Sequence, residues 1–197
     1  MKKLSLFAAL FLFCFVVTAA QAQQLDAAFG FSAMTAPSSF SPASGHGFQT
    51  VGGGTFPTFS ADVLFKHHLG FQGEVAFRAK QNLYEGYQPF RPIFYDFNAI
   101  WAPPLGKKMA AEMMGGIGSL SSRFYQSSYS CSFTGCTDYV SSNHLLGHVG
   151  FGLRYYVWNS VFIRPEAHFY FVRNNYEFSG PRVARYGISI GYTFGKE

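Results

Sequence analysis

Charged and imidazole side chains recur at alternate positions of this chain, and their chemistry suits a buried ion-pair network. His148 and Arg154 share one parity, as do Arg164, Glu166 and His168 in a later segment. A guanidinium group binds a carboxylate through two parallel hydrogen bonds and keeps its charge at any physiological pH. These residues therefore predict ion pairs, provided that the chain brings their faces together.

The predicted network is larger than these two segments. It comprises Glu74, Arg78, Asp96, Glu112, His148, Arg154, Arg164, Glu166, His168 and Arg185, while Asp26, Asp62, Lys66 and His144 share the same face. Two interpretations stay open. The network is either a narrow, gated polar path for small solutes or a structural plug that fixes the register of the strands around it.

Three histidines raise the question of a metal site. His144 and His148 lie four residues apart, about 13 Å in an extended strand, which is too far to share one ion. Only His148 and His168 could approach each other, and the sequence offers them no paired third ligand. We interpret them as hydrogen-bonded polar residues, and we expect no metal and no cofactor.

The elements that carry these residues read as strands, because apolar and polar residues alternate with period two. The segments 25–33, 58–66, 69–80, 92–101, 108–120, 143–157, 161–173 and 185–194 show this alternation. Segment 108–120 is also compatible with the start of a helix. The connections between them alternate between long and short, and 121–142 is expected to be the longest polar loop.

The last of these strands carries a recognisable pattern. Tyr186, Ile188, Ile190, Tyr192 and Phe194 all lie on its apolar face. This pattern resembles the C-terminal assembly signal of bacterial outer-membrane β-barrels, which implies the barrel-assembly machinery as a partner. Across segment 23–197, the chain resembles the OmpA/OmpX-like group of small outer-membrane barrels. The resemblance implies an all-β, eight-stranded, antiparallel, transmembrane up-and-down β-barrel with both termini in the periplasm.

The N-terminal segment 1–22 reads as a secretory signal peptide. Lys2 and Lys3 precede a short apolar run, and Ala20-Gln21-Ala22 provides a cleavage site after Ala22. The remaining segment, 23–197, is expected to be one barrel domain in the outer membrane of a Gram-negative-type cell. A net charge of +5 is too small to imply nucleic acid as a partner.

Period two alone does not say which face of a strand points inward. The polar face also carries glycines, such as Gly150 and Gly191, which suit a crowded lumen better than a solvated surface. Trp101 and Trp158 each stand at a strand end beside a short turn, where an interfacial aromatic belt belongs. We therefore expect the polar face inside and the apolar face against lipid.

Cys131 and Cys136 bracket a glycine in the predicted polar loop. Secretion exposes both to an oxidising compartment, so we expect a disulfide bond that stiffens this loop.

Basic residues gather where the predicted strands meet the long loops. They are Arg78, Lys80, Arg91, Arg123, Arg173, Arg182 and Arg185. Arginine suits phosphate binding, so these residues either contact outer-membrane lipid, such as the phosphates of lipopolysaccharide, or only solubilise the loops.

The predicted function is a non-enzymatic structural role with surface interactions through the loops. A narrow porin is one alternative. The other is an enzyme that modifies outer-membrane lipid, since Ser141, Ser142 and Asp138 lie near His144. No enzyme signature accompanies these residues, so no catalytic residue is predicted. The surface ligand is unknown.

Overall fold

The computed structural model describes residues 24–37, 50–65, 68–132, 135–175, 177–178 and 180–195. They form the strands β1 (Gln24–Thr35), β2 (Thr55–Leu64), β3 (Leu69–Phe77), β4 (Asn82–Tyr84), β5 (Gln88–Trp101), β6 (Met109–Ser132), β7 (Gly135–Tyr156), β8 (Val161–Val172) and β9 (Arg182–Phe194). The predicted signal peptide lies outside these residues. Within the described ranges, no helix has the length and apolarity to cross a membrane.

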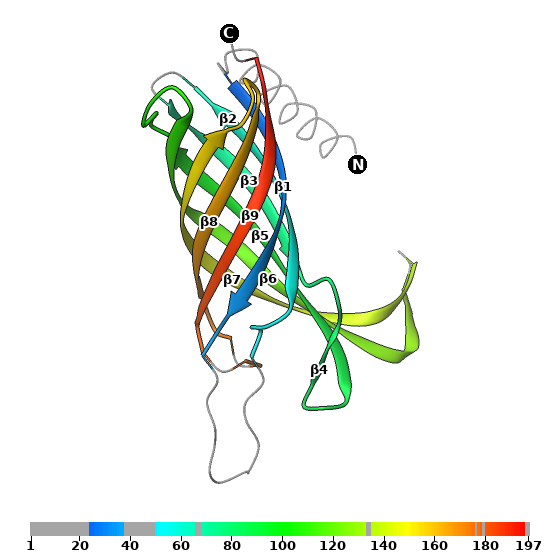
Figure 1. The fold of residues 1–197 in the computed structure, drawn as a ribbon. Coiled ribbons are helices and arrows are strands. Elements are labelled where there is room, and N and C mark those ends of the chain that lie inside the picture. The colour runs from blue at the N-terminus through cyan, green and yellow to red at the C-terminus, as the bar shows by residue number, and fades with distance from the viewer. Residues whose placement is uncertain are drawn as a thin grey trace, which may run out of the picture.

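Eight of the strands close into a ring (Figure 1). Every pairing is antiparallel, β1 pairs with β9, and β3 pairs with β5. The small strand β4 pairs only with β5 among the described residues and stands outside the ring. The predicted all-β, eight-stranded, antiparallel up-and-down barrel is confirmed.

The barrel has two unlike ends (Figure 1). Strand β1 starts and β9 finishes at the end that carries the short connections 65–68, 102–108 and 157–160, which we call the short-turn end. The opposite, long-loop end carries the remaining connections. In bacterial outer-membrane barrels the short turns face the periplasm.

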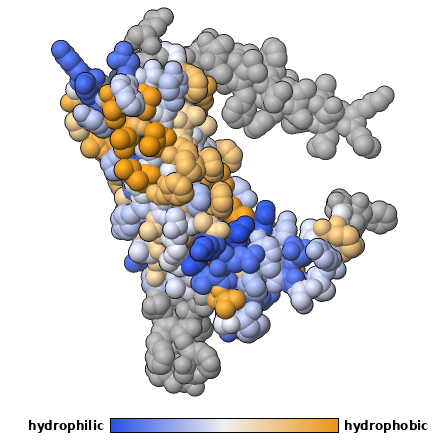
Figure 2. Space-filling model, turned by 45° about the vertical axis from the view of Figure 1, so that its right-hand side comes forward, coloured by the Kyte–Doolittle hydropathy of each residue, from blue (hydrophilic) through white to orange (hydrophobic). Residues whose placement is uncertain are grey.

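The polar face points inward and the apolar face outward, as predicted. On β9, Ser189 and Thr193 are almost fully buried, whereas Ile190 is 62% exposed. Among the described outward positions of the eight ring strands, the only charged residues are Arg91, Arg123 and Arg182, all at the long-loop end. Figure 2 shows the resulting apolar surface on the barrel wall and a hydrophilic surface toward the long-loop end.

The prediction of a loop at 121–142 is wrong. Strands β6 and β7 continue through it as one hairpin, in which Arg123 pairs with Ser141 and Tyr125 with Tyr139. The hairpin extends away from the ring (Figure 1). The hairpin was not predicted because both of its faces meet solvent and carry polar residues. Apolar and polar residues therefore do not alternate along it.

The connection 81–91, which lies between the strands predicted at 69–80 and 92–101, is not wholly a loop, because it contains the hairpin of β4 and β5. Glu85 and Gly86 both have positive φ, 50° and 84°. This is the backbone of the turns that fit the right-handed twist of a hairpin.

Apolar side chains fill the lumen near its long-loop end. These buried residues are Met34, Val51, Phe56, Ala76, Phe90, Phe94, Leu120, Leu146, Tyr170, Val172, Phe178 and Val183. We call them the apolar plug. Most of them occupy inward strand positions, which the sequence analysis expected to be polar.

Candidate functional site: an ion-pair network in the lumen

Arg154 of β7 is the centre of the network near the short-turn end. Its guanidinium group donates to carboxylates on three other strands: Asp26 of β1, Asp62 of β2 at 2.7 Å, and Glu112 of β6. All four side chains are essentially inaccessible to solvent. One buried arginine therefore links four strands of the ring.

Arg164 of β8 shares two of these carboxylates. Its Nη1 donates to Asp62 at 3.1 Å and to Glu112 at 3.0 Å, and its Nε donates to Glu166 at 2.9 Å. Nη2 donates to the hydroxyl of Ser60 at 2.7 Å. The ion pairs predicted for Arg154, Arg164 and Glu166 are therefore present in the structure.

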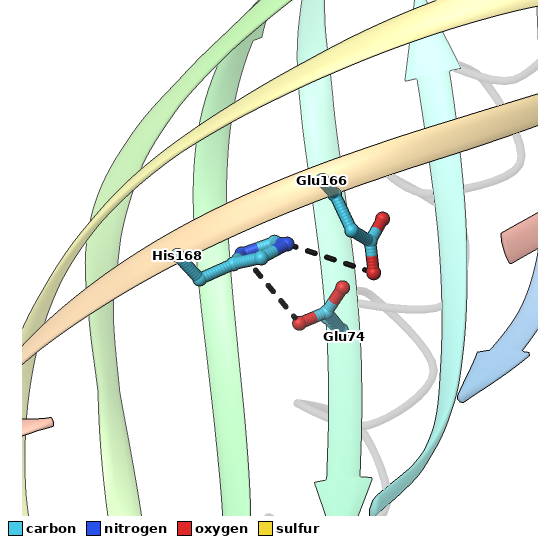
Figure 3. A group of neighbouring side chains, drawn as sticks. All are labelled: Glu74, Glu166 and His168. Atoms are coloured by element: carbon cyan, nitrogen blue, oxygen red, sulfur yellow. Dashed lines mark ion pairs between the residues drawn. The ribbon is translucent and has the colours of Figure 1, made fainter. Parts of the chain in front are cut away.

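Arg185 of β9 completes the network toward the apolar plug. Its Nη2 donates to Oε1 of Glu74 on β3 and lies 3.8 Å from Oε1 of Glu166. Its guanidinium carbon lies 5.7 Å from the centre of the Tyr170 ring. Glu74 of β3 converges beside it with Glu166 and His168 of β8 (Figure 3).

Amide and imidazole side chains connect the carboxylate Glu112, beside Arg154 and Arg164, with His168, beside Arg185. Gln72 Nε2 donates to Glu112 at 3.4 Å, and Asn98 Nδ2 donates to Gln72 Oε1 at 3.2 Å. Asn98 Oδ1 lies 2.6 Å from His148 Nδ1, and His148 Nε2 lies 2.8 Å from His168 Nδ1. The result is a continuous hydrogen-bonded chain through the lumen.

Nine of the ten residues predicted for the network lie together in the lumen. The exception is Arg78, which lies past the end of β3, half-buried beside Gly54, and has no ion pair among the described residues. The prediction for Arg78 is wrong because β3 ends at Phe77. Beyond the end of a strand, alternate residues no longer point to the same face. The predicted network did not include Asp26 and Asp62, although both were expected on the same inward face.

A second polar cluster lies at the long-loop end. His144 Nε2 is 2.8 Å from Glu177 Oε2 and 3.1 Å from the hydroxyl of Ser142, which also donates to Glu177 Oε1 at 2.5 Å. Burial alone would raise the pKa of Glu177. Hydrogen bonds from Ser142, from its own backbone and from His144 outweigh burial and lower this pKa.

This cluster lacks the geometry of a catalytic triad. In a triad, the carboxylate holds one ring nitrogen of the histidine and the serine faces the other. Here Glu177 and Ser142 both contact Nε2 of His144, and the serine proton goes to the carboxylate. Sequence reasoning identified Ser142 and His144 but expected Asp138 as the acid. Glu177 comes from the β8–β9 connection, which no local pattern links to β7.

Three of the other predicted basic residues, Lys80, Arg173 and Arg182, are exposed at the long-loop end. Arg91 and Arg123 are directly opposite each other on β5 and β6 and face outward. Among the described residues, no carboxylate lies within ion-pair distance of either one. Arg185, which the sequence analysis also assigned to this end, instead points into the lumen and is fully buried.

The other predicted site residues lie on the surface. Cys131 and Cys136 form a disulfide bond between β6 and β7 near the tip of the hairpin. Trp101 and Trp158 are 46% and 70% exposed beside short connections at the short-turn end. Tyr186, Ile188, Ile190, Tyr192 and Phe194 all point outward along β9 and are between 46% and 62% exposed.

Known structures share this fold. No family model matches the sequence, and no curated protein matches it. The structure is similar to neisserial surface protein A, NspA, with a TM-score of 0.61 and 11% identity over 87% of this chain and 96% of that one. It is also similar to Ail of Yersinia pestis, solved with the heparin analogue sucrose octasulfate, with a TM-score of 0.57 and 13% identity over 87% and 98%.

A third similar structure is the N-terminal β-barrel domain of OprF from Pseudomonas aeruginosa. Its TM-score is 0.54, with 11% identity over 88% of this chain and 98% of that one. The chain therefore has the fold of the small eight-stranded outer-membrane β-barrels of the OmpA/OmpX-like group. Identities this low establish the fold and leave the activity to be argued from the residues.

Proposed function

We propose that this protein is an outer-membrane barrel with a closed lumen, which acts through its outer surface and its long-loop end. The observation that carries the proposal is the filled interior. Ion pairs occupy the short-turn half and the middle of the lumen, and the apolar plug occupies the long-loop half. A partner larger than an ion must therefore bind on the outside.

The filled lumen argues against the alternative of a small-solute porin. Eight strands enclose an interior just wide enough for side chains, and here large side chains such as Arg164 and Phe94 occupy it. Wild-type protein in a planar lipid bilayer should show no stable conductance steps. Discrete steps that change size in an Arg164→Ala variant would instead favour the porin.

The proposed partner surface is the outward pair Arg91 and Arg123. Like charges directly opposite on neighbouring strands destabilise a sheet, so an anion between them would relieve the repulsion. Nε of each arginine is buried without a hydrogen-bond partner, and the Arg123 guanidinium lies 4.8 Å from the centre of the Tyr139 ring. Both residues lie where the wall reaches the long-loop end, so the proposed anion is a phosphate of the outer-leaflet glycolipid.

The structure of Ail supports an anionic partner in a limited way. That protein was solved with sucrose octasulfate, a polyanionic heparin analogue. Ail has a similar fold, which is consistent with an anionic partner, and the choice of phosphate here rests on Arg91 and Arg123.

Binding of the refolded barrel to lipopolysaccharide tests the proposal. An Arg91→Ala/Arg123→Ala variant should bind about tenfold more weakly or worse, since each charge-assisted hydrogen bond contributes roughly 1.5–3 kcal/mol. A Lys107→Ala/Lys108→Ala variant is the matched control, because it removes the same charge from the short-turn end. Equal binding by both variants would refute the site, as would unchanged wild-type binding to dephosphorylated lipid.

We also propose that the cluster of Ser142, His144 and Glu177 is structural. The shared contact of His144 Nε2 supports this, because a histidine in that position does not take the serine proton. Incubation of the barrel with outer-membrane lipid should leave the lipid mass unchanged. A mass change that His144→Ala abolishes and Cys131→Ser does not would favour the lipid-modifying enzyme.

A further inference from the structure

The lumen contains more negative than positive charge. Six carboxyl groups are buried there, from Asp26, Asp62, Glu74, Asp96, Glu112 and Glu166, against three guanidinium groups, from Arg154, Arg164 and Arg185. With neutral histidines, three negative charges stay unbalanced in the described part of the interior. A buried charge without a partner is strongly unfavourable, so additional positive charge in the lumen would stabilise the fold.

The unbalanced charge concentrates in the middle of the lumen. Glu74 and Asp96 are directly opposite each other on β3 and β5. Glu74 Oε2, Asp96 Oδ2 and Glu166 Oε1 are all buried without a hydrogen-bond partner. Arg185 donates to the other oxygen of Glu74 and lies 3.8 Å from Glu166 Oε1, so it compensates only part of this charge.

The hydrogen-bonded chain of amides fixes which nitrogen of His168 carries a proton. Both amide donors of Asn98 are used, on Gln72 and Asp96, so its oxygen accepts from His148 Nδ1. A neutral His148 then has a bare Nε2, which accepts from Nδ1 of His168. His168 Nε2 is therefore left with a free lone pair.

This lone pair faces another acceptor. His168 Nε2 lies 3.6 Å from Glu166 Oε1, and neither atom has a hydrogen-bond partner (Figure 3). On the other edge of the imidazole, Nδ1 lies 4.0 Å from Oε1 of Glu74, whose Oε2 also has no hydrogen-bond partner. Unpartnered acceptors of two carboxylates beside a free imidazole nitrogen match the arrangement of metal ligands.

The second oxygen of each carboxylate is already held in place. Glu166 Oε2 accepts from Arg164 at 2.9 Å, and Glu74 Oε1 accepts from Arg185 and from the hydroxyl of Tyr170 at 3.5 Å. Metal-binding histidines and carboxylates characteristically have such outer partners, which orient the free atom toward the ion. One ligand atom from each of Glu74, Glu166 and His168 lies within 4.8 Å of the other two.

We propose that Glu74, Glu166 and His168 bind a divalent transition-metal ion, of which Zn²⁺ is the best match. One imidazole and two carboxylates suit Zn²⁺, whereas Ca²⁺ and Mg²⁺ prefer oxygen ligands alone. Bonds of about 2.0–2.2 Å place the ligands of a tetrahedral ion roughly 3–3.5 Å apart, so the 3.6 Å contact already fits. Glu74 provides the third ligand atom, within 4.8 Å of the other two, and water takes the fourth position.

Zinc content of the refolded, tag-free barrel tests this site. The protein is refolded in detergent with Zn²⁺, freed of unbound metal by gel filtration, and analysed by mass spectrometry for zinc per chain. Co²⁺ loaded in the same way gives a visible absorption spectrum that reports its ligands. We expect about one metal ion per chain, and at least tenfold weaker retention in Glu166→Gln and in His168→Gln.

Matched controls separate this site from adventitious binding at the surface. His144→Gln and Glu177→Gln remove an imidazole and a carboxylate from the other polar cluster and should retain the metal. A heat-dependent gel shift verifies that each variant is folded. Folded wild-type protein without retained zinc would overturn the proposal and leave protons or water as the compensation. Equal retention by the His168→Gln and His144→Gln variants would overturn it as well.

Discussion

At the residue scale, the interior depends on three arginines that each contact several carboxylates. Arg154 is the clearest case, because it binds Asp26, Asp62 and Glu112 with no solvent contact. Removing one partner of a buried ion pair leaves the others uncompensated. Arg154→Met should therefore lower the free energy of unfolding by about 3–5 kcal/mol, measured by urea unfolding of the refolded barrel.

Arg173→Met is the control for this substitution. Arg173 is exposed just after β8, where a surface substitution should change stability by only about 0.5 kcal/mol or less. A similar small effect of Arg154→Met would mean that the network does not stabilise the fold.

The contacts of Glu177 predict a pH dependence at the long-loop end. Its pKa is lowered below the ordinary value of about 4.3, so its ion pair and hydrogen bonds stabilise the folded loop above that pH. This stabilisation is lost as the pH falls through the lowered pKa. Hydrogen exchange of the β8–β9 connection, corrected for intrinsic rates, should accelerate between about pH 5 and 3 in wild type and show no such transition in Glu177→Gln.

Residue types and faces in the lumen could be predicted from the sequence, whereas their partners could not. Strict alternation put Glu166 and His168 on one face, and the structure places both inside. Arg154 meets Asp62 from across the ring, and this contact depends on strand register and barrel closure. The apolar plug was not predicted either. Its residues, such as Phe94, lie at inward strand positions, which were expected to be polar.

At the element scale, close packing of β9 against β8 makes one glycine critical. A Cβ at Gly191 would lie 2.2 Å from the Phe162 ring, which is itself fully buried. Gly191→Ala should therefore cost roughly 1–3 kcal/mol of stability by overpacking. Gly73→Ala is the control, because its Cβ would meet only Phe97, at 3.7 Å. Equal urea midpoints for the two variants would contradict this packing.

The extended hairpin of β6 and β7 should be stabilised locally by its disulfide. A loop this short gains roughly 2 kcal/mol from closure, and the described residues of the hairpin tip pair only with each other. Cys131→Ser/Cys136→Ser should increase proteolysis at the tip and leave the unfolding midpoint of the barrel unchanged. A lowered barrel midpoint would show that the hairpin supports the ring.

Elements with one buried face were predictable, and elements with two solvated faces were not. Strand β9 was recognised because aromatic and branched residues alternate with small polar ones. The outer part of β6, with Ser127, Ser128 and Tyr129, has no apolar face and therefore reads as a loop. Its strand structure comes from pairing with β7, which no local pattern encodes.

At the scale of the whole molecule, the barrel has an apolar exterior that only a bilayer satisfies. Large exposed apolar side chains, such as Phe97 at 72% and Ile117 at 66%, cover the wall, while the charges are inside. Such a surface would aggregate in water. A bilayer would match this surface with lipid, and we expect the tryptophans near the short turns at the membrane interface.

The most direct test of this arrangement uses the only two tryptophans in the sequence, Trp101 and Trp158. Both lie at the short-turn end, so their fluorescence reports one interface of the membrane. The barrel is refolded into vesicles of lipids brominated at defined depths along the acyl chain. We predict strong quenching by bromines near the headgroups and weak quenching by bromines at the chain ends. No quenching at any depth, or strongest quenching at the bilayer centre, would contradict the proposed membrane barrel.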